Sequence, residues 1–493
     1  MAASRTTASP STPRSGARLV AANSGWQLVT FAARAVAGLG VVVLVARAGG
    51  PRSLGVFQFA LMLSSILPFY YGVPPLLARE VARAPEQSRR WIEAGTLVAL
   101  VAGAGFAGLL VLGTAVSGAS AETLAAVQLA AAGMAFDGVA RVQFAVFWAW
   151  ERMHLEAVVT SVQEAAFLAA TVAALAAGGG AMEALVAFAA SRALGAGLGW
   201  LVVGRRLGAV VVPRASLPFL RSTLRRCTSF AVNDTLTLAH SRADAVMLGM
   251  IKGPVAVGLH QAGTNLVLYF NVLARSLNHA LYPRMSKAWP VRPDQFRRLR
   301  DASLRSIGLV AVPIAVGCLL LAPRTFDVLY GPEFDRAVLA YQVLVLVIPL
   351  RMLSHTLSIS LAAADRQNRR VIGVATVTAL NIGLNLYMIP RWSYLGAAVT
   401  AVVCETVLML MYAYFLRRVA GGSRIPRSLV LPLAASVPMA GAVLVTTHQH
   451  LLVSVALGSA VYALAVLGLA VLRAPAAGRR PAKALVALVR PAP

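Results

Sequence analysis

Apolar runs of about 18 to 25 residues recur along the chain, and they constrain the fold more than any other feature. A helix of this length can cross the hydrocarbon core of a bilayer, and Arg, Gly and Pro bound the runs here. Hydrophobic residues occupy 58% of the 493 positions and charged residues only 13%, too few to cover a soluble protein of this size. The sequence therefore predicts an all-α polytopic membrane protein.

The runs predict about fourteen transmembrane helices. In chain order they span residues 19–46, 53–78, 91–116, 121–149, 154–177, 182–204, 227–251, 254–283, 302–322, 337–363, 371–389, 394–416, 428–447 and 450–472. The first run is too long for a signal peptide and contains Arg34, so we expect it to be retained. The remaining segments are a disordered tail over 1–18, a basic connector over 205–226 and a second tail over 473–493.

Most of the 45 Lys and Arg residues lie in alternate segments between the predicted helices. The connector alone holds six of the arginines: Arg205, Arg206, Arg214, Arg221, Arg225 and Arg226. The positive-inside rule places these segments, and both termini, in the cytoplasm next to anionic lipid. The formal net charge of +27 therefore indicates a membrane surface, and we expect no nucleic-acid partner.

An internal repeat divides the chain into two lobes. Gly50-Pro51-Arg-Ser-Leu-Gly55 follows the first predicted helix, and Gly253-Pro254-Val-Ala-Val-Gly258 follows the seventh. Six helices separate the two copies, so both copies enter the membrane in the same orientation. We predict two pseudo-symmetric six-helix lobes, an N-lobe over 19–204 and a C-lobe over 227–418, with two further helices in 428–472.

Charged and amide side chains occur inside the predicted helices, where they are costly unless they face protein or water. Asp137 and Arg141 are four residues apart, a spacing that permits an intrahelical ion pair, and Arg351 and His355 share that spacing. A single Asn or Thr more often hydrogen-bonds a neighbouring helix, and Arg351 could instead extend to the membrane interface. The remaining polar candidates are Asp234, Asp244, Glu164, Asn271, Arg275 and Asn278, the last three on one helix face. Together these positions predict a polar cavity between the lobes.

Arg34 and Arg275 lie several turns from their helix ends with no acidic residue three or four positions away. A buried cation without a counter-charge needs an anion. The planar guanidinium suits phosphate because it can donate two parallel charge-assisted hydrogen bonds. These two residues therefore predict an anionic, phosphate-bearing substrate.

Enzyme signatures are absent from the sequence. The chain has no Gly-rich nucleotide loop ending in lysine, and its segments outside the helices are too short for a catalytic domain. The three cysteines, Cys227, Cys318 and Cys404, have neither disulfide nor metal spacing. We therefore expect no enzyme, no metal site and no cofactor.

Several motifs resemble the polysaccharide-flippase branch of the multidrug/oligosaccharidyl-lipid/polysaccharide (MOP, MATE-like) exporter superfamily. They occur in the family's order over about 20–420: Arg47-Ala-Gly-Gly-Pro-Arg-Ser-Leu-Gly55, Asp244 before Gly-Pro-x-x-x-Gly, Tyr330-Gly-Pro-Glu-Phe334, Asn381-Ile-Gly-Leu-Asn385-Leu-Tyr-Met-Ile-Pro390, Leu395-Gly396-Ala-Ala398 and Glu405. Ser393 departs from the pattern, which has Gly there, and predicts a stiffer turn. The resemblance implies a MATE-like fold whose lobes alternate between inward-open and outward-open states.

The resemblance implies a flippase that moves undecaprenyl-pyrophosphate-linked oligosaccharide across the bacterial cytoplasmic membrane for cell-surface polysaccharide synthesis. Arg34 and Arg275 would hold the pyrophosphate, Arg141 and Arg351 would extend the cationic surface, and Asn271 and Asn278 would bind sugar hydroxyls. The candidates for ion coupling or gating are Asp244, Asp234, Asp137 and Glu164. A proton or sodium gradient is the candidate energy source. Candidate partners are membrane lipid, glycosyltransferases and a polysaccharide polymerase.

Three alternatives remain open. Relatives in the superfamily flip the peptidoglycan precursor or export drugs and cations, although a cation exporter would want an acidic cavity where this chain has Arg34. A non-transporting scaffold could instead recruit glycosyltransferases through its basic loops. The sequence identifies neither the glycan, the coupling ion nor the oligomeric state.

Overall fold

The computed structural model describes residues 13–65, 68–116, 118, 120–208, 211–270, 281–422 and 425–473, and every regular element in these ranges is helical. The first part of the chain forms α1 (Pro13–Ser64), α2 (Pro68–Arg83), η1 (Pro85–Gln87), α3 (Ser88–Val116), α4 (Ala121–Ala149), α5 (Met153–Ala176), α6 (Ala181–Leu207) and α7 (Leu217–Lys252). The second part forms α8 (Pro254–Tyr269), α10 (Pro293–Leu320), α11 (Ala322–Leu329), η2 (Pro332–Phe334), α12 (Asp335–Val345), α13 (Val347–Ala363), α14 (Gln367–Ala420), α15 (Ile425–Val445) and α16 (Leu451–Arg473). The predicted all-α polytopic fold is confirmed.

Two compact units divide the chain, and each is described here by itself. The N-unit comprises Met1–Val45 and Ala60–Ala239, and the C-unit comprises Ala46–Phe59 and His240–Pro493. A short segment of α1 therefore packs within the C-unit although it precedes most of the N-unit in sequence. The predicted ends of the lobes, the connector and the tails remain predictions.

Ten helices within the described residues are long and apolar enough to cross a membrane. The helices α1 and α14 each join two of the predicted helices. The backbone is kinked at the junction, at Gly49–Gly50 in α1 and at Ser393 in α14. The predicted second helix, 53–78, is divided between the end of α1 and α2. The predicted helix at 337–363 corresponds to α12 and α13, which form one span with η2. The shorter α8 falls below the length of a full span because the described helix ends at Tyr269.

The duplicated turn has the same backbone conformation in both copies. Gly50 has φ 65° and ψ −165°, and Gly253 has φ 80° and ψ −177°, a region that is essentially restricted to glycine. A proline follows each glycine and starts the next helix, where its missing N–H costs nothing. Within the C-unit the two copies also touch, since an ideal Cβ on Gly55 would lie 1.7 Å from the carbonyl oxygen of Pro254.

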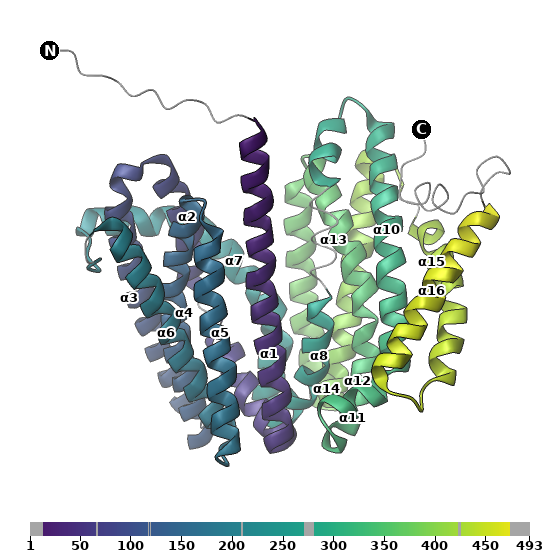
Figure 1. The fold of residues 1–493 in the computed structure, drawn as a ribbon, viewed down its shortest axis with the longest axis horizontal. Coiled ribbons are helices and arrows are strands. Elements are labelled where there is room, and N and C mark those ends of the chain that lie inside the picture. Colours follow the sequence, from purple (N-terminus) through teal and green to yellow (C-terminus); the bar gives the residue numbers. More distant parts are fainter. Residues whose placement is uncertain are drawn as a thin grey trace. The chain divides into compact units, whose positions relative to one another are not determined.

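The N-unit has an apolar core at which α2, α3, α4 and α6 meet (Figure 1). Phe144 and Phe147 of α4 are fully buried there, and Trp91 of α3 packs against Phe219 near the start of α7. The connector is tied to this core by ion pairs, with Arg226 on Glu80 at 2.7 Å and Arg214 on Glu93 at 3.1 Å. As a result α7 begins at Leu217, ten residues before the predicted helix.

In the C-unit, α8 packs against α12 and α14, and α13 packs against α10 and α14. The last two helices, α15 and α16, pack on each other, and α15 also contacts α10 (Figure 1). The hydroxyl of Tyr462 on α16 donates to the carbonyl of Leu309 on α10 at 2.8 Å. This pair of helices therefore belongs to the C-unit by packing.

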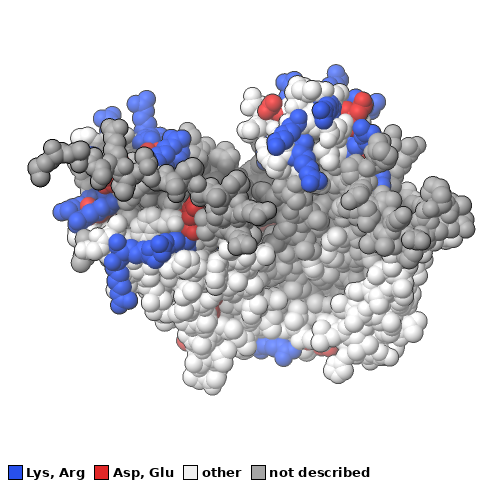
Figure 2. Space-filling view, turned by 45° about the horizontal axis from the view of Figure 1, so that its top comes forward, with Lys and Arg blue, Asp and Glu red and all other residues white. Residues whose placement is uncertain are grey.

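On the face that Figure 2 shows, most of the basic side chains gather at one end of each unit, and few charged side chains lie elsewhere on that face. This distribution fits helices that are embedded along their sides in lipid. Cytoplasmic placement of the basic ends remains a prediction.

Candidate functional site

The N-unit contains a cluster of ion pairs inside its helices, which we call the N-cluster: Arg34, Asp137, Arg141, Glu156, Glu164 and Arg192. Within it, Nε of Arg141 donates to Oδ2 of Asp137 at 2.7 Å, one helical turn apart on α4. The predicted intrahelical pair is therefore confirmed. Arg141 therefore compensates much of the charge of Asp137 within α4 itself.

Arg192 on α6 binds the second carboxylate, Glu164 on α5. Its two terminal nitrogens lie 2.7 and 3.2 Å from the two oxygens of Glu164, and one of them is 4.0 Å from Asp137. The guanidinium also lies over the ring of Phe188, 4.9 Å from its centroid. A bidentate pair with a stacked ring is a rigid arrangement, so Arg192 is fixed in place.

Glu156 on α5 is the third carboxylate, and α1 supplies two groups that face it. Oε2 of Glu156 accepts from Nε2 of Gln27 at 2.7 Å and from Nε1 of Trp148 at 2.6 Å. Arg34 lies farther off, with 3.9 Å between its nearest nitrogen and Oε1. The expectation that Arg34 has no counter-charge is corrected, because α5 brings it a carboxylate from 122 positions away.

The three arginines of the N-cluster balance its three carboxylates, but they differ in accessibility. The side chains of Arg34 and Arg141 are 41% and 38% exposed, whereas that of Arg192 is 11% exposed. Arg192 therefore neutralises the buried acids. Arg34 and Arg141 are the cations that an incoming anion could reach.

The C-unit holds a second group, which we call the C-cluster: Asp244, His260, Arg351, Asn381, Asn385 and Glu405. Oδ2 of Asp244 on α7 lies 3.4 Å from Nε2 of His260 on α8. Oδ1 of Asp244 accepts from the N–H of Ala245 at 2.8 Å. Arg351 lies within electrostatic range of Asp244. Asp244 is thus linked to two other ionisable groups of the cluster.

Arg351 on α13 pairs with Glu405 on α14, with 2.5 Å between Nε and Oε1. An acidic partner therefore holds Arg351 within the C-unit, and the alternative placement near a membrane interface stays a prediction. Glu405 is 9% exposed at its side chain, and its Oε2 has no hydrogen-bond partner among the described residues. The ion pair therefore leaves Oε2 of Glu405 available for another hydrogen bond.

Amide groups on α14 complete the C-cluster. Nδ2 of Asn385 donates to Oδ1 of Asn381 at 3.1 Å, and both side chains are buried. In the described part of the chain, Oδ1 of Asn385 is buried without a partner. Unpaired buried oxygens cost free energy, so this part of the cluster is suited to a cation or a polar ligand.

The side chains of four predicted site residues are not described by the structure. Asn271, Arg275 and Asn278 lie outside the described residues, and the side chain of Asp234 is likewise not described. Their proposed roles remain predictions.

No site role was predicted for Glu156, Arg192 or His260, and Asn381, Asn385 and Glu405 entered the prediction only as motif residues. Glu156 was passed over although it is an acid inside a predicted helix, and His260 although it follows the duplicated turn. Arg192 is the only charged residue of the predicted helix 182–204 apart from Glu183 at its start, and that isolation could have identified it.

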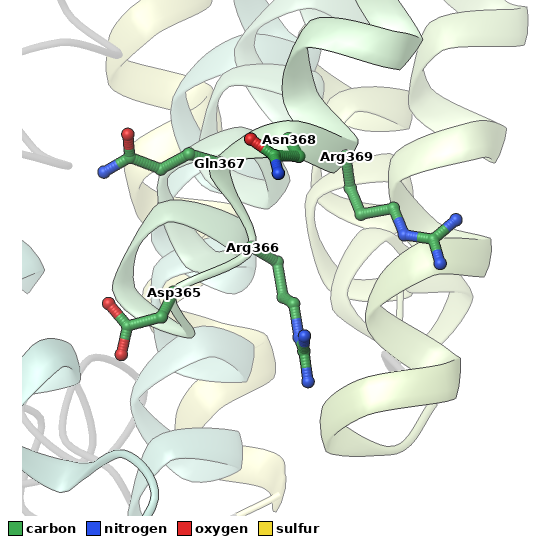
Figure 3. Close-up of a pocket in the computed structure, with 5 residues that line it drawn as sticks. All are labelled: Asp365, Arg366, Gln367, Asn368 and Arg369. Carbon is green, nitrogen blue, oxygen red and sulfur yellow. The ribbon is translucent and has the colours of Figure 1, made fainter.

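A surface pocket lies at the turn between α13 and α14 (Figure 3). Its lining residues are Asp365, Arg366, Gln367, Asn368 and Arg369. Asp365 and Gln367 point to one side and Arg369 to the other, so their polar atoms do not converge. The pocket is therefore a hollow beside a turn and not a candidate substrate site.

Comparison with known proteins relates the chain to membrane transporters. The family described as polysaccharide biosynthesis protein matches residues 20–289, more than half of the chain. The Probable flippase AglR of Haloferax volcanii is 27% identical over 175 residues, 34% of this chain and 36% of that protein. The Putative O-antigen transporter of Escherichia coli strain K12 is 26% identical over 180 residues, 35% of this chain and 43% of that protein. The chain thus spans less than half the length of the curated relatives it matches.

Solved structures show the same fold at low sequence identity. Lipid II flippase MurJ in an inward closed conformation has a TM-score of 0.74 at 14% identity, over 89% of this chain and 97% of that chain. An inward-facing multidrug resistance MATE family transporter of the MOP superfamily has a TM-score of 0.65 at 13% identity, over 81% and 98%. The predicted MATE-like fold is confirmed.

Proposed function

The chain belongs to the polysaccharide biosynthesis protein family, and on this premise we propose that it is a flippase for a lipid-linked oligosaccharide. It would carry undecaprenyl-pyrophosphate-linked glycan across the bacterial cytoplasmic membrane by alternating access. The relatives described as a flippase and as an O-antigen transporter support this class of substrate.

The observation that carries the proposal is the loose position of Arg34. Its guanidinium is 3.9 Å from Glu156, whose other oxygen already accepts from Gln27 and Trp148 at 2.7 and 2.6 Å. Glu156 therefore keeps these two hydrogen bonds when Arg34 turns to a pyrophosphate. A charge-assisted bidentate bond to phosphate is stronger than a pair at this distance.

Arg141 would widen the cationic surface beside Arg34, since its side chain is similarly exposed. For Arg275, Arg351, Asn271 and Asn278 we retain the sequence-based roles in binding pyrophosphate and sugar. Asp244 would couple transport to an ion gradient, with Asp234, Asp137 and Glu164 as further candidates. Asp137 and Glu164 are the weaker candidates because Arg141 and Arg192 already neutralise them.

Replacing Arg34 tests the proposal. We expect Arg34→Ala to abolish surface polysaccharide at normal protein level and Arg34→Lys to retain part of it, since lysine keeps the charge but loses the planar fork. Arg391→Ala is the matched control, because Arg391 is exposed and contacts only Tyr387 of its own helix among the interactions seen. Normal export by Arg34→Ala would refute the assignment.

A second candidate is a peptidoglycan-precursor flippase, favoured by the fold match to MurJ over 97% of that chain. Expression in cells depleted of their own precursor flippase separates the two functions. Growth without restored surface polysaccharide would favour this second candidate.

We further propose that both termini face the cytoplasm and that glycosyltransferases and a polymerase act with this transporter. Cysteines introduced into the two tails test the orientation. Labelling by an impermeant maleimide in intact cells would refute it.

A further inference from the structure

Aromatic side chains are exposed in the N-unit where the turn between α4 and α5 packs against α1. Trp26 of α1 is 39% exposed and Trp148 of α4 is 36% exposed. The ring of Trp26 lies near that of His154 on α5, with 6.4 Å between the centroids and 58° between the planes. Together with Gln27, these three residues form a group that we call the aromatic site. Its rings come from three different helices.

Hydrogen bonds fix the aromatic site in place. Nδ2 of Asn23 donates to the carbonyl of Glu151 in the α4–α5 turn at 3.2 Å. Nε2 of Gln27 and Nε1 of Trp148 both donate to Oε2 of Glu156, at 2.7 and 2.6 Å. The carboxylate accepts from Nε2 of Gln27, so the amide turns its Oε1 elsewhere, and this oxygen has no partner among the described residues. The site therefore offers rigid rings and one available hydrogen-bond acceptor.

The aromatic site shares its helix faces with the two exposed cations of the N-cluster. Gln27 lies seven residues before Arg34 on α1, and Trp148 lies seven residues after Arg141 on α4. Seven residues are two helical turns, which return to the same face about 10 Å along the axis. On both helices this step leads toward the α4–α5 turn, so a ligand bound at the cations can extend over the rings.

The position of Trp148 distinguishes this site from tryptophans that anchor a protein in the lipid interface. Such an anchor lies on an apolar, lipid-facing surface and directs its N–H to the headgroups. Trp148 instead shares a helix face with Arg141, which is too costly to expose to hydrocarbon, and its N–H points to the buried Glu156. The exposed ring therefore faces polar surroundings.

A sugar ring has the chemistry that matches these surroundings. One face of a pyranose carries C–H groups with partial positive charge, which pack on the electron-rich face of an aromatic ring, and its rim carries hydroxyls that need acceptors. The planes of Trp26 and His154 are 58° apart, so they form no parallel slot for a flat aromatic ligand. A puckered ring can rest on one face at a time.

We propose that the aromatic site is a subsite for a pyranose ring of the glycan. The sugar stacks on Trp26 and Trp148, and one of its hydroxyls donates to Oε1 of Gln27. A diphosphate held by Arg34 places the sugars joined to it next to the rings. Stacking contacts the ring carbons, so the subsite accepts more than one kind of pyranose. The proposal rests on the proposed function and adds to it the part of the N-unit that contacts sugar.

The test compares the binding of three lipids to the full-length protein by native mass spectrometry in detergent. The probes are undecaprenyl pyrophosphate and the same lipid carrying N-acetylglucosamine or galactose. We expect the wild type to bind the two sugar-bearing lipids about three- to tenfold more tightly than the sugar-free lipid. Trp26→Ala should remove this preference and Trp26→Phe should keep most of it, with binding of the sugar-free lipid unchanged in both.

Trp392→Ala is the matched control, because Trp392 is 52% exposed but belongs to the C-unit. It should leave all three affinities unchanged. Unchanged binding of the sugar-free lipid by Trp26→Ala also shows that this variant is folded.

Three results would overturn the proposal. They are equal binding of the three lipids by the wild type, a sugar preference that survives in Trp26→Ala, and an equal loss of all three lipids in Trp26→Ala, as a membrane anchor would give. Arg34→Ala tests the proposed function separately, since it should weaken all three lipids. If Trp26→Ala loses the preference while Arg34→Ala binds normally, the sugar subsite stands and the role of Arg34 falls. If the wild type shows no preference while Arg34→Ala loses binding, the reverse holds.

Discussion

Replacing Arg192 by leucine should strongly destabilise the N-unit. Glu164 is 5% exposed at its side chain, and Arg192 binds both of its oxygens. Nε2 of Gln163 is 3.5 Å away and is too distant to replace the ion pair. Removing one partner of a buried ion pair costs about 3–5 kcal/mol, because it leaves the other charge uncompensated.

The assay is thermal unfolding of the detergent-purified protein within a double-mutant cycle. We expect Arg192→Leu to lower the melting temperature clearly and Arg192→Leu combined with Glu164→Gln to recover part of the loss. Arg34→Leu is the contrasting variant, since its looser and more exposed pair contributes about 0–1 kcal/mol. Purely additive effects of the two substitutions, or wild-type melting of Arg192→Leu, would refute this account of the N-cluster.

Three further substitutions test the turns and the connector. Gly55→Ala should destabilise by about 1–3 kcal/mol despite the better helix propensity of alanine, because its Cβ would lie 1.7 Å from the backbone oxygen of Pro254. Ser393→Gly should stabilise by about 1 kcal/mol, because Ser393 has φ 49° and ψ −133°. Glu80→Gln should cost about 1 kcal/mol at neutral pH and less in acid. Burial alone would raise the pKa of Glu80, but hydrogen bonds from Arg226 and Arg79 hold it below its ordinary value, so the stabilisation fades as the pH falls through that lower pKa.

Each of these three substitutions has a control in the same thermal-unfolding assay. Gly317→Ala lies inside α10 with no atom within 4 Å of its ideal Cβ, so it should not destabilise. Ser393→Ala keeps the positive φ and should bring no gain. A Glu80→Gln difference that stays constant down to about pH 3 would contradict the role of its carboxylate.

Local interactions were predictable from the sequence, whereas distant partners were not. The Asp137–Arg141 pair follows from a four-residue spacing on one helix, and the glycine-proline turns follow from their residue types. The partner of Arg34 comes from α5, and only the packing of helices could reveal it. The same holds for Arg351, whose acid lies 54 positions away on α14.

The kink at Ser393 lies in the predicted gap between the helices 371–389 and 394–416, and α14 continues on both sides of it. The stiffer turn predicted there stays a prediction. The connector was predicted to end at residue 226, with the next helix beginning at residue 227. Phe219, Leu220 and Leu224 instead give it an apolar face that packs on the N-unit core, which allows α7 to begin early.

The duplicated turns kept their backbone geometry because it depends on glycine and proline, but the charges of the two units diverged. We infer that Arg34 of the N-unit binds the anion through a fixed charge. Because a guanidinium keeps its charge over the physiological range, Arg34→Ala should reduce export by a similar factor at every pH between about 6 and 8. A loss of export confined to one end of that pH range would contradict a fixed-charge role for Arg34.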